Sequence, residues 1–543
     1  MITKPTQKAV TVIKLGLLPF RAARAVTGWP VRGIRSVAAR GRPTSMPTPD
    51  DKAKSISPIR PDVERIHVLD SRGRLRISPT IVPALSATVG ALEAETGAIL
   101  GFTKGRLNRL RFDERASCSG ATYAPDVKAA NDERRAIERD GGVFCGIVHS
   151  HPGLLGVPSA EDRVYAQRIL RNARVDQLVL PIVLPGNGGA SCRINWYLAR
   201  PGATDEAEIV AVEVAVASDS LSGQFDRVMG AYDVDWLVRC RIVAVGCGGA
   251  REALEGLARI GVGQFVLIDP DIVTGPNLAT QAVYRRELGR PKVHACADAI
   301  REINPDAVVV AVERSIEEIV PRQLDILLSG RWAGSPAPVR VVVGTWTDDH
   351  AANAYGHRAA VAAGLPVVSA SLHAHGASGE IILAYPGRTK GCIRCATKSR
   401  YDHYLAGGVN NATSAGAPLW ATTRLNALKM CVTVAALHAV EPGECGRPSR
   451  ERRVQTALLE KIARRPMAIM RLSPDARTLS GVTHHDRVFS GCDQPDRLLF
   501  DETVWRGVDA VPGCPDCGGS GYGGHPQRVH PWLRRPLDRE APA

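Results

Sequence analysis

Apolar residues in the first half of the chain form short continuous runs, separated by segments in which apolar positions recur at helical spacing. Residues 98–102 and 143–149 have the composition of buried strands, and residues 164–171 have the spacing of a helix. Two later runs, 177–184 and 192–199, are typical of further strands. This succession of strands and helices predicts an α+β domain.

The second half opens with a succession of strand, helix and strand. Residues 241–245 and 264–268 are apolar runs of strand length, and residues 252–260 between them have helical spacing. Such a succession is typical of a βαβ unit in a mostly parallel sheet, so an α/β fold is predicted here. Residues 425–440 predict another helix. The stretch 450–466 is highly charged, and we expect a mobile or crossover segment there.

The turn after the first strand of this unit is rich in glycine and suited to binding phosphate. Backbone N–H groups of Gly246, Gly248 and Gly249, together with the following helix N-terminus, would face an anion. Asp269 lies about twenty positions further on, at the end of the second strand, where a ribose hydroxyl would be held. Arg251 occupies the position of the usual third glycine, which argues against the close helix–strand packing that glycine allows.

Two histidines and an aspartate are spaced to hold a metal ion. His149 and His151 leave the strand at 143–149, and residues two apart on a strand point the same way. Asp162 follows eleven positions after His151, at the start of the next helix. Three such ligands and a vacant fourth position are what a hydrolytic zinc needs. Ser159 and Asp162 also satisfy a helix capping box, but capping accounts for neither histidine.

This motif and a glutamate well upstream resemble the JAMM (MPN/JAB) metalloprotease motif. The resemblance covers about residues 60–215 and implies that the two histidines and the aspartate bind zinc. Glu95, which precedes a glycine-bounded apolar strand, would be the general base for the attacking water and later the acid for the leaving amine. Ser159 would donate a hydrogen bond to the tetrahedral oxyanion. Glu93 is the rival base, and Glu95 has the alternative of being an ordinary exposed carboxylate at a helix end.

Four motifs after the glycine-rich unit together resemble the ThiF/MoeB adenylyltransferases, the family that includes the ubiquitin-activating enzymes. They are residues 277–281, 289–292, 303–306 and 344–349. Enzymes of this family adenylate the C-terminal glycine of a ubiquitin-like protein. By this resemblance Asp269 binds ribose, and Asn277, Gln281 and Lys292 face the phosphates of ATP. Asp348 would hold magnesium or assist the departure of pyrophosphate.

The chain departs from the usual pattern of this family at three positions. Thr280 stands in place of an arginine, Asp349 in place of an asparagine, and Asn353 in place of a second arginine. Two missing cations and an extra acid should weaken ATP binding unless other arginines compensate. The candidates are Arg251, Arg285 and Arg286. The alternative is a retained fold with reduced or lost adenylation.

Four cysteines form two Cys-x-x-Cys pairs that lie far apart in the sequence. Cys392 and Cys395, with Cys514 and Cys517, would give a tetrahedral four-thiolate zinc site. Such a site would tie the C-terminal end of the second domain to its middle. The alternative reading, a redox dithiol, would need only one of the pairs.

The cysteine content as a whole favours free thiols and metal binding over disulfides. The thirteen cysteines are an odd number spread through a long chain, which indicates a reducing compartment, and we expect a cytoplasmic protein. If a thioester-forming cysteine exists, Cys431 and Cys445 are the candidates. Cys431 lies in an apolar helix and is expected in the core, whereas Cys445 lies in a loop and is more reactive in principle.

The length of 543 residues is too great for one core, and the composition, 44% hydrophobic and 5% aromatic, suits a soluble multidomain protein. No apolar run reaches membrane-spanning length. We divide the chain into a basic, disordered extension (1–59), a metalloprotease domain (60–220), an adenylyltransferase domain (221–520) and a tail (521–543).

The net charge of +14 is not taken as a sign of nucleic-acid binding. A large part of it lies in the first forty-odd residues, which precede the first acid, Asp50, and no aromatic-interleaved basic surface is evident. This extension is expected to be a disordered tail, or to reflect a start codon assigned too early, with Met46 as the true start. A short amphipathic, anion-seeking leader is the alternative.

These features imply a two-headed enzyme of a bacterial ubiquitin-like pathway, with a JAMM domain followed by a Rossmann-like ThiF-type domain. The first head would use zinc to hydrolyse a peptide or isopeptide bond after a ubiquitin-like C-terminus. The second would use ATP and magnesium to adenylate the freed carboxylate. The alternatives are processing of a sulfur-carrier protein, and an active protease that carries a degraded ThiF-type binding module. A conjugating enzyme is a further expected partner, and the resemblance implies a homodimer through the ThiF-type domain.

Overall fold

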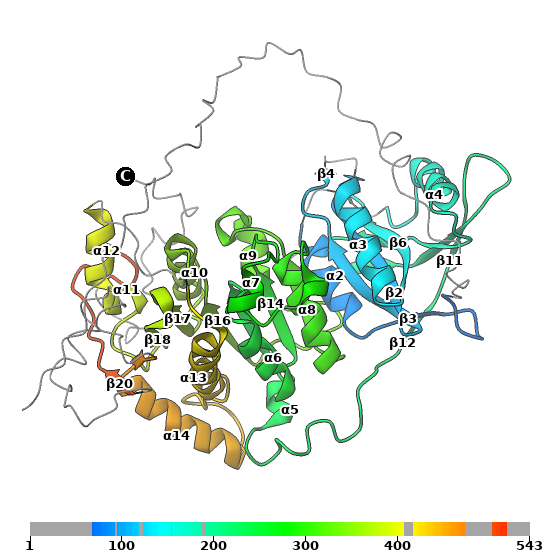
Figure 1. The fold of residues 1–543 in the computed structure, drawn as a ribbon. Coiled ribbons are helices and arrows are strands. Elements are labelled where there is room, and N and C mark those ends of the chain that lie inside the picture. The colour runs from blue at the N-terminus through cyan, green and yellow to red at the C-terminus, as the bar shows by residue number, and fades with distance from the viewer. Residues whose placement is uncertain are drawn as a thin grey trace, which may run out of the picture. The chain divides into compact units, whose positions relative to one another are not determined.

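A computed structural model describes residues 68–92, 95–118, 123–153, 155–186, 192–406, 416–472 and 502–518. These residues build two regions, each organised around its own β-sheet (Figure 1). The front region runs from β1 (Leu75–Ile77) to β12 (Val214–Val216), and the back region runs from α5 (Val234–Leu237) to β20 (Thr503–Arg506). The basic extension (1–59), the whole of the tail (521–543) and Glu93 lie outside the described residues. Among the helices of the described part, none has both the length and the apolar character that crossing a bilayer requires.

The front region contains a ten-stranded mixed sheet, whose main path runs in the order β11-β10-β7-β6-β2-β3-β1-β12. Its central strands, β2 (Gly97–Thr103) and β6 (Val143–Ser150), pair antiparallel and are buried along almost their whole length. Burial on both faces explains their continuous apolar runs. The other strands of the sheet are β1 (Leu75–Ile77), β3 (Arg106–Phe112), β7 (Leu178–Val179), β8 (Ile182–Leu184), β9 (Arg193–Asn195), β10 (Tyr197–Arg200), β11 (Glu208–Ala211) and β12 (Val214–Val216).

Two of the predicted strands are each divided in the structure. The run 177–184 breaks between β7 and β8 at Pro181, which has no N–H to donate to a ladder. The run 192–199 breaks at Trp196 into β9 and β10. A separate two-stranded hairpin is formed by β4 (Ser117–Cys118) and β5 (Tyr123–Ala124). These interruptions are too local to be visible in a hydrophobic pattern.

Helices cover both faces of the front sheet, and the side chains of β2 alternate between them. Ala98 and Leu100 join one apolar cluster, and Ile99 joins the other. The helix α3 begins with an Asp126 cap that accepts the N–H of Ala129 at 2.9 Å. The helices of this region are α2 (Ile81–Ala87), the 3₁₀ turn η1 (Val89–Ala91), α3 (Val127–Arg139) and α4 (Ala160–Ala173).

The back region contains an eight-stranded sheet in the order β15-β14-β13-β16-β17-β18-β19-β20. From β15 to β17 all neighbours run parallel, and from β17 to β20 they run antiparallel. The mostly parallel sheet predicted for this half is therefore present. The strands are β13 (Cys240–Val245), β14 (Gln264–Ile268), β15 (Val308–Val312), β16 (Arg340–Thr345), β17 (Val367–Leu372), β18 (Ser378–Ala384), β19 (Met467–Arg471) and β20 (Thr503–Arg506).

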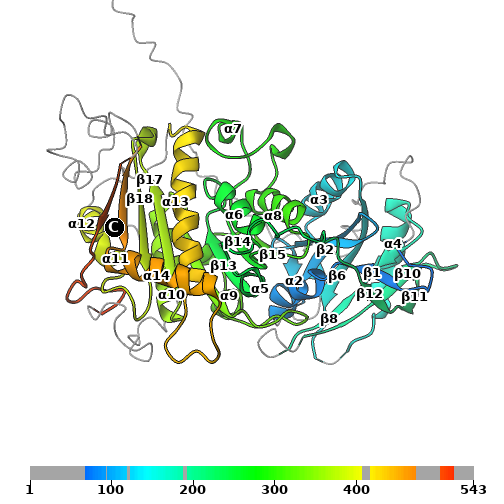
Figure 2. The same ribbon diagram turned by 90° about the horizontal axis from the view of Figure 1, so that it is seen from below.

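Two helical layers sandwich this sheet, with α6, α8 and α13 on one face and α9 and α10 on the other (Figure 2). On β13, Ile242 joins the first cluster and Val243 the second, as expected when successive side chains point to opposite faces. The helices are α5 (Val234–Leu237), α6 (Arg251–Arg259), α7 (Asn277–Thr280), α8 (Lys292–Ile303), α9 (Pro321–Leu328), α10 (His350–Ala362), α11 (Ile393–Ala396), α12 (Lys398–Leu405), α13 (Leu419–Leu437) and α14 (Arg450–Arg464), with the 3₁₀ turns η2 (Arg285–Glu287), η3 (Ile316–Glu318) and η4 (Ala374–Gly376).

The charged stretch at 450–466 is a helix, and the expectation of a mobile or crossover segment there is wrong. Ser449 caps α14 by accepting the N–H of Arg452 at 3.2 Å. Leu459 and Ile462, three positions apart, are buried against the core. Arg452 is itself buried, with its guanidinium 3.4 Å from the centroid of Trp236. Charged residues outnumber apolar ones in this helix, but the few apolar residues lie on one side and are sufficient to pack it against the core.

The two regions meet along β3 and α2 of the front region and β15 of the back region. Ala87 and Ala91 from the front belong to the same buried apolar cluster as Val310 and Leu328 from the back. Ala333 in the back region donates its N–H to the hydroxyl of Ser86 at 2.9 Å. The apolar core is therefore continuous across the interface.

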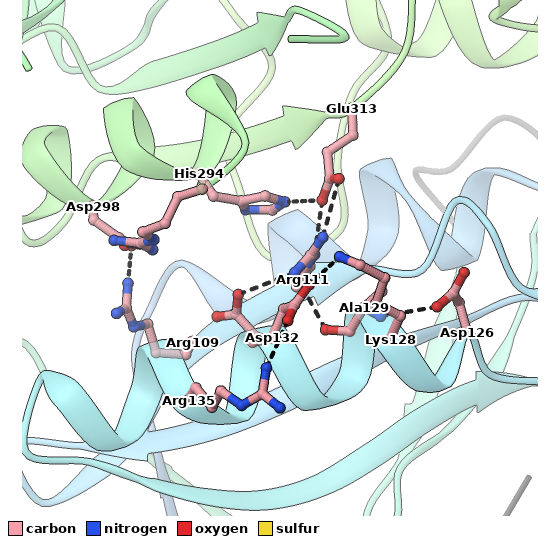
Figure 3. Close-up of polar contacts among 12 residues, drawn as sticks. Arg109, Arg111, Asp126, Lys128, Ala129, Asp132, Arg135, His294, Asp298 and Glu313 are labelled. Atoms are coloured by element: carbon pink, nitrogen blue, oxygen red, sulfur yellow. Dashed lines mark hydrogen bonds and ion pairs between the residues drawn. The ribbon is translucent and has the colours of Figure 1, made fainter. Parts of the chain in front are cut away.

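Charged side chains from the two regions also pair across this interface (Figure 3). Arg111 on β3 contacts both carboxylate oxygens of Glu313, with Nε–Oε1 at 2.7 Å and Nη2–Oε2 at 3.1 Å. His294 on α8 lies 2.7 Å from the same Oε1. Nearby, Arg109 forms an ion pair with Asp298, also on α8. The side chains of Arg111 and Glu313 are only 8% and 9% exposed, so this contact is shielded from water.

Candidate functional site

The end of β6 and the first turn of α4 bring the three predicted metal ligands together. His149 lies near the end of β6, His151 follows that strand, and Asp162 lies in the first turn of the helix. The capping box is present as well. The Ser159 hydroxyl accepts the N–H of Asp162 at 3.1 Å, and the Asp162 carboxylate accepts the N–H of Ser159 at 2.7 Å. The cap therefore orients the aspartate toward the histidines.

The spacing of these three side chains fits a zinc ion. The Nε2 atoms of His149 and His151 lie 2.9 Å apart, and they lie 3.1 and 3.2 Å from the two carboxylate oxygens of Asp162. A tetrahedron with bonds of about 2.0–2.1 Å has edges of roughly 3.3 Å. Nδ1 of His151 bonds the carbonyl of Leu155 at 2.9 Å, which places the proton on Nδ1 and leaves Nε2 as a metal donor.

Glu95 lies beside this cluster, where the chain enters β2. The antiparallel register pairs Gly97 with His149, so Glu95, two residues earlier, comes opposite the second histidine. The approach is held by Thr96, whose N–H donates to the Ser150 hydroxyl at 3.0 Å and whose carbonyl accepts the Ser150 N–H at 2.8 Å. Partial burial raises the pKa of Glu95, and the neighbouring histidines oppose this shift.

Tyr123 forms a wall of this site that no sequence motif indicated. Its ring stacks on His149, with centroids 6.1 Å apart and an interplanar angle of 7°. Its hydroxyl donates to Asp113 at 3.1 Å, and burial raises the pKa of Asp113 to about 6. A Cβ atom on Gly97 would lie 2.3 Å from the Tyr123 ring, so this glycine makes room for the tyrosine. The position of Tyr123 beside the histidine follows from the tertiary contact between β2 and the β4–β5 hairpin, which the sequence does not show.

In the back region, every residue predicted to contact ATP or magnesium lines one cavity of about 840 Å³. The cavity lies at the C-terminal ends of β13, β14 and β16, where open α/β sheets bind ligands. The residues are Gly246, Gly248, Gly249, Asp269, Asn277, Gln281, Lys292 and Asp348. The fold thus brings together all eight, and their individual roles stay predictions.

The glycine-rich turn is tied to the acidic residue at the end of β14. The carboxylate of Asp269 accepts the N–H of Cys247 at 2.8 Å and that of Asp271 at 3.0 Å. Burial raises the pKa of Asp269. Nζ of Lys292 forms an ion pair with Oδ2 of Asp271 at 2.8 Å. Gly246 has a φ of +92°, and a Cβ there would lie 2.7 Å from the backbone that follows β16, so the close approach of these loops requires glycine.

The three departures from the adenylyltransferase pattern also line the cavity, where two of them support local structure. Asp349 caps α10 by accepting the N–H of Ala351 at 2.8 Å. Asn353 donates through Nδ2 to the carbonyl of Thr347 at 2.7 Å. Thr280 ends α7. None of these three residues supplies a cation.

Other cations line the cavity, and they are not the arginines predicted to compensate. Among the described lining residues, Arg251, Arg285 and Arg286 do not occur. Arg251 is buried and pairs with Glu255 at 2.9 Å and Glu287 at 2.8 Å. The cations that do line the cavity are Lys292, Arg314, Arg400 and Lys429. A sequence signal existed for Arg314, because it follows the C-terminal end of the parallel strand β15.

The two Cys-x-x-Cys pairs converge, although they are more than a hundred residues apart. The Sγ–Sγ distances are 3.7 Å for Cys392–Cys395, 3.8 Å for Cys392–Cys514 and 3.6 Å for Cys395–Cys517. A tetrahedral zinc with Zn–S bonds of about 2.3 Å has edges of roughly 3.8 Å. The four thiols therefore fit a four-thiolate zinc, as predicted, and not a single redox pair.

The two candidate thioester cysteines are both exposed. Cys431 lies on α13, and the expectation that it belongs to the core is wrong because it occupies the outward face of this otherwise largely buried helix. Cys445 lies in the loop before α14, as predicted.

Each of the two regions contains a stretch that matches a known family. Residues 85–197 match the family described as prokaryotic homologs of the JAB domain, and residues 221–442 match the ThiF family. Over 84 residues the chain is 38% identical to the SAMP-activating enzyme E1 of Haloferax volcanii, which covers 15% of this chain and 31% of that protein. Over 80 residues it is 36% identical to the molybdopterin-synthase adenylyltransferase of Salmonella typhimurium, covering 14% and 32%.

The chain therefore matches about a third of the length of these two relatives. Among solved structures, MccB of Escherichia coli with ATP superimposes with a TM-score of 0.35 and 17% sequence identity. This superposition covers 52% of the present chain and 68% of MccB.

Proposed function

Because this chain fuses a JAB-type domain to a ThiF-type domain, we propose that it is a two-headed enzyme acting on a ubiquitin-like or sulfur-carrier protein. The first head cleaves the peptide or isopeptide bond after the C-terminus of the carrier, and the second adenylates the carboxylate released. The observation that carries this proposal is the single cavity lined by all eight predicted ATP and magnesium contacts. The three-ligand cluster beside Glu95 supports the first head.

In the first head, the three ligand residues would hold a zinc ion, which when bound supplies Lewis acidity to the scissile carbonyl and the attacking water. Glu95 would take a proton from that water and deliver it to the amine nitrogen as the C–N bond breaks. The Ser159 hydroxyl accepts the N–H of Asp162 through a lone pair. Its own proton therefore stays available for the oxyanion.

In the second head, a carboxylate oxygen of the carrier would attack the α-phosphorus of ATP, and the bond to pyrophosphate would break. Lys292 and the N–H groups of the glycine turn would neutralise phosphate charge, and Asp269 would hold the ribose. Asp348 would hold the magnesium ion that accompanies ATP. The arginines lining the cavity, Arg314 and Arg400, support retained ATP binding over a degraded module, since they would supply positive charge in place of the two arginines missing from the motif.

The Cys392, Cys395, Cys514 and Cys517 thiolates would bind a second zinc with a structural role, because a closed four-sulfur site leaves no position for water. It would anchor the segment after β20 to the start of α11. The conjugating partner and the ThiF-type homodimer remain predictions drawn from the family resemblance.

The two heads are tested separately. ATP–pyrophosphate exchange that depends on a carrier protein ending in glycine tests the second, and Asp348→Ala should abolish it while leaving proteolysis unchanged. A wild-type chain without exchange would reduce this half to a binding module. Cleavage of a carrier with a C-terminal extension tests the first head, and a chelator should stop cleavage until zinc is restored. A thiocarboxylate product would assign the sulfur-carrier pathway, and protein conjugates would assign the ubiquitin-like one.

A further inference from the structure

We propose that Glu114, which belongs to the front region, is a positioning residue for the nucleotide cavity of the back region and acts through Arg314. The inference rests on the proposed nucleotide function of that cavity. It makes the protease-type region a structural part of the adenylation site, so that the two heads are not independent modules.

The contact between the two residues is close and largely buried. Glu114 follows the end of β3, and its Oε1 accepts the N–H of Glu313 at 2.5 Å. Its Oε2 lies 2.9 Å from Nε of Arg314, and Nη2 of Arg314 donates to the backbone carbonyl of Glu114. The Glu114 side chain is 4% exposed and that of Arg314 is 38% exposed. The guanidinium is therefore held from the front region while its other edge stays accessible.

Arg314 lies at the end of the cavity where Asp269 would hold the ribose. It lines the cavity two residues after the end of β15, and the neighbouring strand β14 ends just before Asp269. The N–H of Asp269 donates to the carbonyl of Val312 at 3.2 Å, which ties the two strand ends together. Among the described residues, Arg314 contacts Glu114 by an ion pair through Nε and a hydrogen bond through Nη2, which leaves Nη1 for a ligand. A guanidinium placed there suits a nucleoside, because it donates to ribose or base acceptors and stacks on a ring.

The loop that carries Arg314 is fixed by the front region at a second point. Glu313, the preceding residue, is held by Arg111 from β3 and by His294 from α8 (Figure 3). The side chain and the backbone of Glu313 thus both bond to front-region residues. Without the Glu114 carboxylate, Nε of Arg314 and the N–H of Glu313 would lose their partners. ATP would then have to order a more mobile arginine side chain on binding.

Calorimetric titration of the full-length chain with Mg·ATP, paired with exchange kinetics, tests this role. Burial raises the pKa of Glu114 to about 7, so the titration is made at pH 8, where the carboxylate is ionised. Glu114→Ala and Arg314→Ala should each raise the Kd and the KM for ATP about fivefold, the loss of one or two hydrogen bonds. The kcat should change little. Glu114→Gln, which still accepts the N–H of Glu313, should lie between wild type and Glu114→Ala.

The double variant separates positioning from general damage. If Glu114 acts through Arg314, the double variant should bind ATP no more weakly than the weaker single variant. Asp298→Asn is the matched control, because Asp298 pairs with Arg109 across the same interface but does not line the cavity. It should leave the Kd unchanged.

Additive losses, wild-type affinity in Arg314→Ala, or an equal loss in Asp298→Asn would overturn the inference. If Glu114→Ala does not fold, Arg314→Ala still tests the inference, because the Arg314 side chain is partly exposed and its removal should not prevent folding. A wild-type chain that binds no Mg·ATP would overturn the proposed nucleotide function together with this inference, whereas normal wild-type binding with an unaffected Arg314→Ala would overturn the inference alone.

Discussion

At the scale of single residues, burial acts differently on the charged groups of the two sites. Burial would raise the pKa of Asp162, but hydrogen bonds with His149 and His151 outweigh it and hold that pKa far below its usual range. In the cavity, Lys429 donates to Asn426 at 2.7 Å, and burial lowers its pKa to about 7. One group is therefore locked in its charged form, and the other is poised to change charge near neutral pH.

Replacing Glu95 by glutamine should abolish cleavage by the first head without removing its metal. Glutamine keeps the shape but accepts no proton, and loss of a general base costs about 10²–10⁴ in rate. Glu161, exposed in the first turn of α4 and outside the ligand cluster, supplies the control Glu161→Gln, which should cleave at the wild-type rate. Cleavage kinetics and zinc content by atomic emission check both variants. Full activity in Glu95→Gln would transfer the role of base to Glu93.

Lys429 should make ATP binding depend on pH. At pH 8 this lysine is mostly neutral in the empty cavity, because its pKa is lowered to about 7. Phosphates that enter the cavity would favour the ammonium form, so binding should take up part of a proton per ATP at pH 8 and almost none near pH 5.5. Calorimetry in buffers of different ionisation enthalpy measures this uptake. Lys429→Met should bind ATP without it, and an unchanged uptake would assign the proton elsewhere.

At the scale of secondary structure, the start of α4 combines a helix cap with a metal ligand. Ser159→Ala should therefore lower both stability and zinc affinity. The lost cap costs about 1 kcal/mol, because the backbone N–H of Asp162 loses the hydroxyl that accepts it. The first helical turn, which positions the Asp162 carboxylate for the histidines, is then held less firmly. Asp126→Ala removes the comparable cap of α3, which bonds Ala129 away from the cluster. It should lower the free energy of unfolding by a similar amount without changing zinc affinity, as chemical denaturation and zinc titration would show.

Elements whose pattern reflects burial could be predicted from the sequence, and those defined by packing could not. The fully buried strands β2, β13 and β14 were found nearly to the residue, because continuous apolar runs leave few alternatives. The helix α14 was missed because charge hides its narrow apolar stripe. The outward position of Cys431 was missed because an apolar helix does not reveal which face meets the core. The domain boundary predicted between residues 220 and 221 stays a prediction.

The same limit applies to the sites. His149, His151 and Asp162 are close in sequence and lie where a strand ends and a helix begins, so their convergence follows from local geometry. Glu114 and Arg314 are separated by two hundred residues, and neither belongs to a motif. Their contact depends on how the two regions dock, which no periodicity in the chain encodes.

At the scale of the whole molecule, the interface ties the two sheets into one folding unit. Ala87 and Ala91 complete an apolar cluster that belongs mostly to the back region, and Arg111 and Glu313 pair in a nearly dry environment. Residues that share a core and a buried ion pair lose their partners together when either region opens. We therefore expect a single cooperative unfolding transition for the two regions.

Arg111→Ala should break this cooperativity and destabilise the chain by about 3–5 kcal/mol at pH 7.5, because it leaves the Glu313 carboxylate buried without its cation. Differential scanning calorimetry should then resolve two transitions in place of one. Arg135→Ala is the control, since Arg135 on α3 is 63% exposed and, within the described part of the chain, pairs with Asp132 at the surface. Its effect should stay within about 0.5 kcal/mol.

The destabilisation by Arg111→Ala should also depend on pH in a defined direction. Burial alone would raise the pKa of Glu313, but the hydrogen bond with His294 and the charge of Arg111 lower it to about 2, below the 4.5 of the unfolded chain. In the wild type, Glu313 therefore stabilises the fold fully above pH 4.5, and this contribution is lost as the pH falls toward 2. In the variant the pKa of Glu313 rises, so the carboxyl takes up a proton at higher pH and ceases to be an unpaired charge. The difference in unfolding free energy between wild type and variant should consequently shrink from pH 7.5 to pH 5, whereas a constant difference would mean that the arginine acts through packing alone.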